Sequence, residues 1–175
     1  MVNLLKEFLP WGVLVANILE VVLFVALIFK NSFGRALVSF VGKNAVLLGF
    51  LISLAAIGGS LFYSNVVGFE PCVLCWWQRI FIYPQVILFG VALWRRKSDV
   101  FAYVVPLVSI ASLISLYHQY VYMGGTSILP CTALGGACSK IYVMAFGYIT
   151  IPMMSLTVSV AILLHAWAHK VYQSR

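Results

Sequence analysis

Five stretches of mostly apolar residues, separated by short polar segments, dominate the pattern of the chain. A helix that crosses a bilayer needs about 20 mostly apolar residues, and each stretch reaches or approaches that length. The stretches are Phe8–Phe29, Asn44–Tyr63, Trp76–Trp94, Val100–Tyr122 and Val143–Trp167. The third is the shortest, and it spans a bilayer only if its helix begins almost at Cys75. The pattern therefore predicts an all-α polytopic membrane protein.

The composition supports this class and excludes a soluble one. Of the 175 residues, 63% are hydrophobic and only 9% are charged, and the mean hydropathy is +1.06. A soluble domain carries about a quarter charged residues. The formal net charge is +7, but the basic residues form short clusters between apolar stretches, where they act as topology signals. We therefore expect no nucleic-acid partner.

The basic clusters predict the orientation of the spans. They are Lys30, Arg35 and Lys43; Arg95, Arg96 and Lys97; and Lys170 and Arg175. Five spans place all three clusters on one side, which the positive-inside rule makes cytoplasmic. The other two loops, 64–75 and 123–142, hold all four cysteines and then face outward. The first stretch has no net basic start and no obvious cleavage site, so we expect a retained helix.

Two local cysteine pairs are the candidate reactive groups. Cys72 and Cys75 form a Cys-x-x-Cys directly before an apolar helix, where the helix N-terminus favours thiolate and the short disulfide ring is easily reduced. Cys131 and Cys138 have six residues between them in a loop, where either a structural bridge or a second exchange-competent pair is possible. Zinc bound by four thiolates is a further alternative, but it fits poorly with an oxidising face.

Three polar residues inside the apolar stretches are further candidates. Arg79 lies four residues after Cys75, on the same helical face and one turn deeper. It either snorkels to the interface or donates hydrogen bonds to an anion or carbonyl beside Cys75. His118, near the outer end of the fourth stretch, is either a hydrogen-bonded interface residue or a group that titrates near neutral pH. Glu20 lies in the middle of the first stretch, and its role stays open.

Small residues and prolines have structural readings. Gly49, Ser53, Ala56 and Ser60 form a stripe on the second stretch that suits close helix packing. Pro84, Pro106 and Pro152 fall inside the third, fourth and fifth stretches. Transmembrane helices tolerate such prolines as kinks.

The stretch Glu70-Pro71-Cys72-Val73-Leu74-Cys75-Trp76-Trp77-Gln78-Arg79, with the later cysteine pair, resembles the DsbB/BdbC family of membrane thiol oxidases. In the related vitamin K epoxide reductase family the loop pair precedes the Cys-x-x-Cys, whereas here it follows. The resemblance covers roughly residues 44–167 and implies a four-helix bundle. It divides the chain into an additional N-terminal helix with a cytoplasmic loop (1–43), a DsbB-like domain (44–170) and a cytoplasmic tail (171–175).

The resemblance also implies a role for each candidate residue. Cys75 matches the cysteine that contacts quinone, and Cys72 matches its partner. Arg79 matches an arginine that helps to bind the quinone, and His118 matches a histidine often found near it. Cys131 matches the cysteine attacked by the soluble partner, and Cys138 matches its loop partner.

The implied activity is a thiol:quinone oxidoreductase of the bacterial cytoplasmic membrane. It reoxidises an extracytoplasmic thioredoxin-fold oxidase of the DsbA/BdbD type and passes the electrons to ubiquinone or menaquinone. The alternatives are a vitamin K epoxide reductase-like enzyme, a transporter that exports reductant, and a protein with purely structural loop disulfides. A transporter of this kind normally needs cysteines reachable from both faces, and none lies on the predicted cytoplasmic side.

Overall fold

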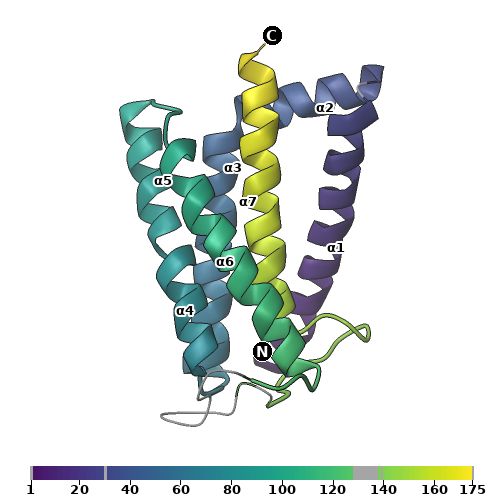
Figure 1. The fold of residues 1–175 in the computed structure, drawn as a ribbon, viewed down its shortest axis with the longest axis vertical. Helices are drawn as coiled ribbons and strands as arrows, with labels where there is room; N and C mark the ends of the chain where they lie inside the picture. The colour runs from purple at the N-terminus through teal and green to yellow at the C-terminus, as the bar shows by residue number, and fades with distance from the viewer. Residues whose placement is uncertain (1, 30, 128–137, 139, 175) are drawn as a thin grey trace.

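The structure is a computed structural model that describes residues 2–29, 31–127, 138 and 140–174. Its helices run as a bundle, and the described residues contain no β-strand, only an isolated bridge between Ala145 and Ile149. The helices are α1 (Val2–Phe29), α2 (Ser32–Lys43), α3 (Ala45–Leu61), α4 (Val73–Ile82), α5 (Pro84–Arg95), α6 (Phe101–Tyr122) and α7 (Ile151–Gln173), with a π-helical turn η1 (Phe62–Val66). Figure 1 shows α1 and α3 to α7 roughly side by side, with α2 lying across one end.

Four helical segments in the described part of the chain are long and apolar enough to cross a membrane. They are Glu7–Phe29, Ala45–Val66, Phe101–Tyr122 and Ile151–Gln173. The chain is therefore a polytopic helical membrane protein, as the sequence predicts. The third predicted span is divided into α4 and α5, because Pro84 has no backbone N–H to continue the first helix and instead begins the second.

The fifth span begins later than predicted, at Ile151 instead of Val143. Thr150 caps the helix by accepting a hydrogen bond from the Met153 N–H at 3.2 Å, and Pro152 sits in the first turn. Both are strong start signals for a helix. Phe146 and Gly147 just before have positive φ angles of 51° and 77°, which no helix continues through. Pro152 therefore starts a helix and does not kink one.

The connection between the first two spans is the amphipathic helix α2. The sequence predicts a loop here, and the structure shows a helix instead. Asn31 caps it by accepting a hydrogen bond from the Gly34 N–H at 2.6 Å. Val38 and Val41 pack with Leu23 and Leu27 of α1 and with Leu164 of α7 in one buried cluster. This cluster joins α1 to the rest of the bundle.

The small-residue stripe on α3 has more than one use. Gly49 lies against the fully buried ring of Phe89 on α5, where a Cβ would meet the ring at 2.5 Å. Close packing is therefore confirmed at Gly49. Ser60, at the other end of the stripe, instead hydrogen-bonds Arg79 of α4 and Tyr83, which lies between α4 and α5.

The cysteines and the basic clusters lie at opposite ends of the bundle. The start of α1 and the described parts of the loops that hold the cysteines gather at one end, with α2, the turn between α5 and α6 and the C-terminus at the other (Figure 1). Lys43, Arg95 and Lys170 mark this second end, because they lie at the ends of α2, α5 and α7.

Candidate functional site

Cys72 and Cys75 form a close dithiol at the start of α4. Cys72 is the N-cap, in extended conformation, and its sulfur accepts a hydrogen bond from the Cys75 N–H at 3.4 Å. Both cysteines are free, and the two Sγ atoms are 3.0 Å apart. That is hydrogen-bonding distance and longer than a disulfide bond. Cys72 is buried, with 4% of its surface exposed.

His118 of α6 lies against this dithiol and not at a free interface. Its Nε2 is 3.5 Å from the Cys72 sulfur, and its Nδ1 is 3.2 Å from Nε2 of Gln78. Gln78 and His118 are both buried. A Gln78 N–H that donates to Nδ1 leaves the imidazole proton on Nε2, facing Cys72. Gln78 of α4 therefore orients His118 of α6, and His118 in turn contacts the sulfur of Cys72.

These contacts favour the thiolate form of Cys72. The hydrogen bond from the Cys75 thiol is the main cause that lowers the pKa of Cys72, and His118 adds a hydrogen bond and an electrostatic attraction. Burial acts in the opposite direction but is outweighed. The contacts therefore favour Cys72 over Cys75 as the thiolate of the pair.

Cys138, from the second cysteine pair, reaches the same place. It is disulfide-bonded and 2% exposed, and it packs in one buried cluster with Cys72, Leu74 and Val121. Cys131 lies outside the described residues. Because Cys138 is in a disulfide, it offers no thiolate to a four-cysteine zinc site. A different group, formed by Cys72, Cys75 and His118, has its sulfur and ring nitrogen atoms within 4.8 Å of one another.

Arg79 lies one turn deeper, but its guanidinium is turned towards α3. Its Nε donates to Ser60 Oγ at 3.1 Å, and Nη2 donates to the Ser60 carbonyl at 3.4 Å. The Tyr83 hydroxyl also donates to Ser60 Oγ, at 2.9 Å. The guanidinium carbon lies 5.2 Å from the centroid of the Trp76 ring. Ser60 therefore holds the cation in the bundle.

An aromatic stack forms the outer edge of the site. Phe69 stacks on Tyr63 with centroids 5.6 Å apart and on Tyr142 at 4.6 Å. The Tyr122 hydroxyl fixes the segment before α7, because it accepts from the Tyr142 N–H at 2.8 Å and donates to the Val143 carbonyl at 3.1 Å. Tyr142, just before the predicted fifth span, is thus held at the outer edge of the site.

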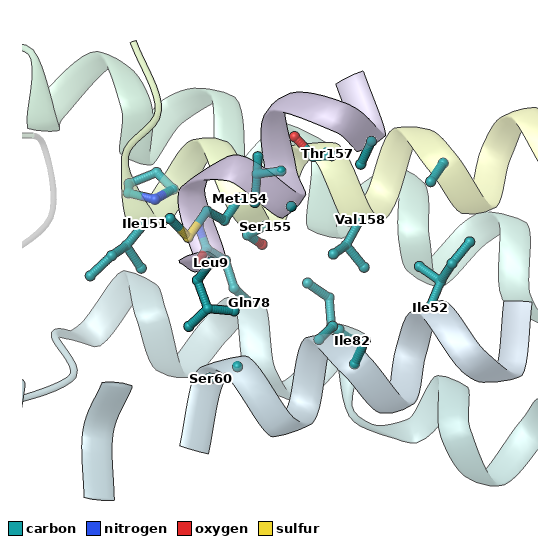
Figure 2. Close-up of a pocket in the computed structure, with 18 of the residues that line it drawn as sticks. Leu9, Ile52, Ser60, Gln78, Ile82, Ile151, Met154, Ser155, Thr157 and Val158 are labelled. Atoms are coloured by element: carbon teal, nitrogen blue, oxygen red, sulfur yellow. The ribbon is translucent and has the colours of Figure 1, made fainter. Parts of the chain in front are cut away.

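One cavity of about 950 Å³ begins at this site and continues between α1, α3, α4 and α7. Cys72, Cys75, Arg79, His118 and Cys138 all line it. Figure 2 shows Leu9 of α1, Ile52 of α3, Ile82 of α4 and Val158 of α7 around the same space. Small-molecule sites commonly measure about 300–1,000 Å³ and are mostly apolar with a few polar groups, as this cavity is.

The structure thus brings together all the predicted site residues that it describes. Cys72, Cys75, Arg79, His118 and Cys138 share one cavity, and Glu20 lines its deeper part. Gln78 and Ser60 are site residues that were not predicted from the sequence. Gln78 stood in the quoted signature next to Arg79, and a serine at the outer end of the second span was the available signal for a partner of Arg79.

A helical bundle in the membrane with a buried dithiol at one end defines the protein as a membrane thiol oxidoreductase. Residues 42–169 match the family model described as disulfide bond formation protein DsbB. The chain therefore belongs to the DsbB family and is a disulfide-forming membrane oxidoreductase. Helix α1 and most of α2 lie before the matched residues. The division of the chain at residues 44 and 170 stays a prediction.

Curated relatives carry names that agree with this family. Disulfide bond formation protein C of Bacillus subtilis is 38% identical over 127 residues, which cover 70% of this chain and 91% of that protein. A probable disulfide formation protein C of Bacillus cereus is 38% identical over 119 residues, covering 65% of this chain and 83% of that protein. A probable disulfide formation protein of Oceanobacillus iheyensis is 41% identical over 122 residues, covering 65% and 79%. No solved structure matches the chain.

Proposed function

We propose that the protein is a thiol:quinone oxidoreductase that reoxidises a secreted thioredoxin-fold dithiol oxidase. The observation that carries this proposal is the shared location of Cys72, Cys75 and Cys138 at the thiol end of one apolar cavity. A relay needs its two cysteine pairs within reach of each other, and a lipid-soluble acceptor needs an apolar route to the last pair.

The proposed relay moves one electron pair per turnover. The partner's thiolate attacks the Cys131–Cys138 disulfide, and resolution of the mixed disulfide leaves the partner oxidised and the loop pair as two thiols. The loop pair then reduces the Cys72–Cys75 disulfide in the same way and returns to a disulfide. The free thiols at Cys72 and Cys75, beside a disulfide-bonded Cys138, correspond to the state after this second exchange.

The residues around the cavity suit a quinone as the acceptor. A quinone has an apolar chain and two carbonyl oxygens, and it supplies a two-electron, two-proton acceptor when bound. Arg79 brings guanidinium N–H donors beyond the two that Ser60 accepts to the thiol end of an otherwise apolar space. Cys72 and Cys75 would return to a disulfide and give up two electrons. The thiol of Cys75 would release one proton, and the other is the proton that Cys72 loses when it forms the thiolate. His118 is positioned to hold the thiolate of Cys72 while this occurs.

The proposed location is the bacterial cytoplasmic membrane, with the cysteine loops on the outer side. The basic residues at the opposite end support this orientation by the positive-inside rule. The outer position would let a secreted partner reach the loop pair. Because the chain belongs to the DsbB family, we propose that the reaction supports disulfide formation in secreted proteins.

The test uses purified protein in detergent, a reduced thioredoxin-fold oxidase as electron donor, and the ultraviolet absorbance of quinone as the readout. We expect quinone reduction that needs both the donor and Cys75, so that Cys75→Ser abolishes turnover. Ser53→Ala, a change on α3 away from the thiols, is the matched control and should retain it. Folded protein with oxidised cysteines that reduces neither ubiquinone nor menaquinone would contradict the proposal.

A further inference from the structure

Helix α1, which lies outside the family match, closes one side of the cavity. Asn17 accepts a hydrogen bond from the Thr157 hydroxyl of α7 at 2.7 Å, and the rings of Phe24 and Trp167 meet edge to face with centroids 6.2 Å apart. On the other side of the cavity, Leu9 lies 3.7 Å from the position of a Cβ on Gly59 of α3. Helix α1 therefore bridges the lateral gap between α7 and α3.

The face of α1 that points into the cavity extends along much of the helix. Its lining residues include Leu9, Gly12, Val13, Ala16, Glu20 and Leu23. From Leu9 to Leu23 an α-helix rises about 21 Å, which is most of the hydrocarbon thickness of a bilayer. The cavity continues to Leu37 and Val41 of α2 at the far end of the bundle. It is thus a long channel with the thiols at one end.

We propose that α1 forms the outer wall of a binding site for the isoprenoid chain of the electron acceptor. The inference rests on the proposed function, because it takes the acceptor's ring to lie at the thiol end of the same cavity. The isoprenoid chain of the acceptor is long and apolar, and it is attached to the ring. The cavity is also long and apolar, and it is continuous with the thiol site, so its shape and lining suit this chain.

Helix α1 would stabilise the bound isoprenoid chain by packing against it more than by removing it from water. Moving an isoprenoid chain from lipid into an apolar channel exchanges one apolar environment for another, so the gain comes from close packing. Helix α1 covers one side of the site, so an acceptor seated there has to slide out along the channel or pass α1 before it can leave. The consequence is a slower release of acceptors that carry a long chain than of acceptors with the same ring and no chain.

Glu20 is a polar residue in the channel, and replacing it distinguishes an isoprenoid chain from a polar molecule bound at the same depth. Its Oε1 is buried and has no hydrogen-bond partner among the described residues. An isoprenoid chain offers no partner either, so Glu20→Leu should leave the release of the acceptor unchanged or make it slower. A polar molecule bound at this depth would instead lose a contact.

The test measures release rates from protein in lipid nanodiscs by recovery of intrinsic tryptophan fluorescence, which bound quinone quenches. Two quinones with the same ring are compared, one with a long isoprenoid chain and one with a methyl group in its place. We expect the long-chain quinone to leave the wild-type protein about fivefold more slowly. Ala16→Trp fills the channel and should remove this difference. Gly12→Leu should do the same, because a Cβ at Gly12 meets no atom within 4 Å and the helix can accept it.

Ile18→Trp is the matched control, since Ile18 is 56% exposed on the opposite, lipid-facing side of α1. It should keep the wild-type difference. Equal release of the two quinones from the wild type, or an unchanged difference in both channel variants, would overturn the inference. So would phospholipid in place of quinone in extracts of the detergent-washed protein, or faster release after Glu20→Leu. If neither quinone is reduced by wild-type protein that binds it, the proposed function fails instead.

Discussion

At the scale of single residues, the reactivity of the site depends on what surrounds Cys72. The sequence predicts the thiolate from the helix N-terminus alone, but the structure adds Cys75 and His118 as direct partners. His118 lies 46 residues away in the chain, and only the packing of α4 against α6 brings it to the sulfur. This is why spacing in the sequence left its role open.

The first residue-scale prediction concerns the pKa of Cys72. The thiolate is lost as the pH falls through this pKa, so a lowered value keeps Cys72 reactive in mildly acidic solution. His118→Leu removes one cause of the lowering and should raise the pKa of Cys72 from about 4 by about 1, which slows alkylation about threefold near pH 4.5 and leaves it nearly unchanged above pH 6. Iodoacetamide labelling of the reduced protein against pH, read by peptide mass spectrometry, measures it. His165→Leu, at the other histidine in the cavity wall, should leave the profile unchanged.

The second residue-scale prediction concerns Arg79. Arg79→Ala should leave the protein folded and lower kcat/KM for quinone by about tenfold or more, because a preorganised donor at the thiol end is lost. Steady-state kinetics with reduced partner in excess measures this ratio. Arg95→Ala removes the same charge from the exposed end of α5 and should leave kcat/KM as in the wild type. Equal kinetics in the two variants would rule out the assigned role.

At the scale of elements, the packing of α3 against α5 shows how small residues set helix distances. Phe89 is completely buried, and Gly49 leaves the space that its ring occupies. Proline and capping residues then decide where helices begin. Hydropathy alone extended the fifth span backwards over 143–150, because an apolar count cannot detect the Thr150 cap or the positive φ angles before it.

The element-scale prediction compares two glycines of α3. Gly49→Ala should lower the free energy of unfolding by about 1–3 kcal/mol, since the new methyl group collides with the immobile ring of Phe89. Gly58→Ala meets no atom within 4 Å and should be neutral or stabilising by up to about 1 kcal/mol, the helix propensity of alanine over glycine. Unfolding in detergent, followed by circular dichroism, gives both values. A loss at Gly58 as large as at Gly49 would argue against this packing.

At the scale of the whole molecule, the basic residues and the cysteines lie at opposite ends of the bundle axis. The sequence predicted the membrane class, the order of the spans and the gathering of the cysteine loops at one end, because hydropathy and charge act over whole segments. It could not predict the cavity, which is formed by side chains from α1, α3, α4 and α7 together. Nor could it predict that α1 lies beside α7, since contacts between distant helices leave no local pattern.

The whole-molecule prediction is topological. A reporter active only in the cytoplasm, fused after α7, should be active, and alkaline phosphatase fused in the 64–72 loop should be active on the outer side. The basic residues at the ends of α2, α5 and α7 are the cause, because they resist translocation. Phosphatase activity at the C-terminal fusion would reverse the orientation and with it the access of a secreted partner.

The near-complete burial of Cys72 and Cys138 has a consequence for how the protein withstands its surroundings. With 4% and 2% of their surfaces exposed, the two residues are insulated from water-soluble thiols such as glutathione, which are too polar to enter the cluster. A soluble reductant therefore cannot attack the sulfur of Cys72 or of Cys138 directly. Exchange at either sulfur needs a thiol that the packing of the protein itself brings to it.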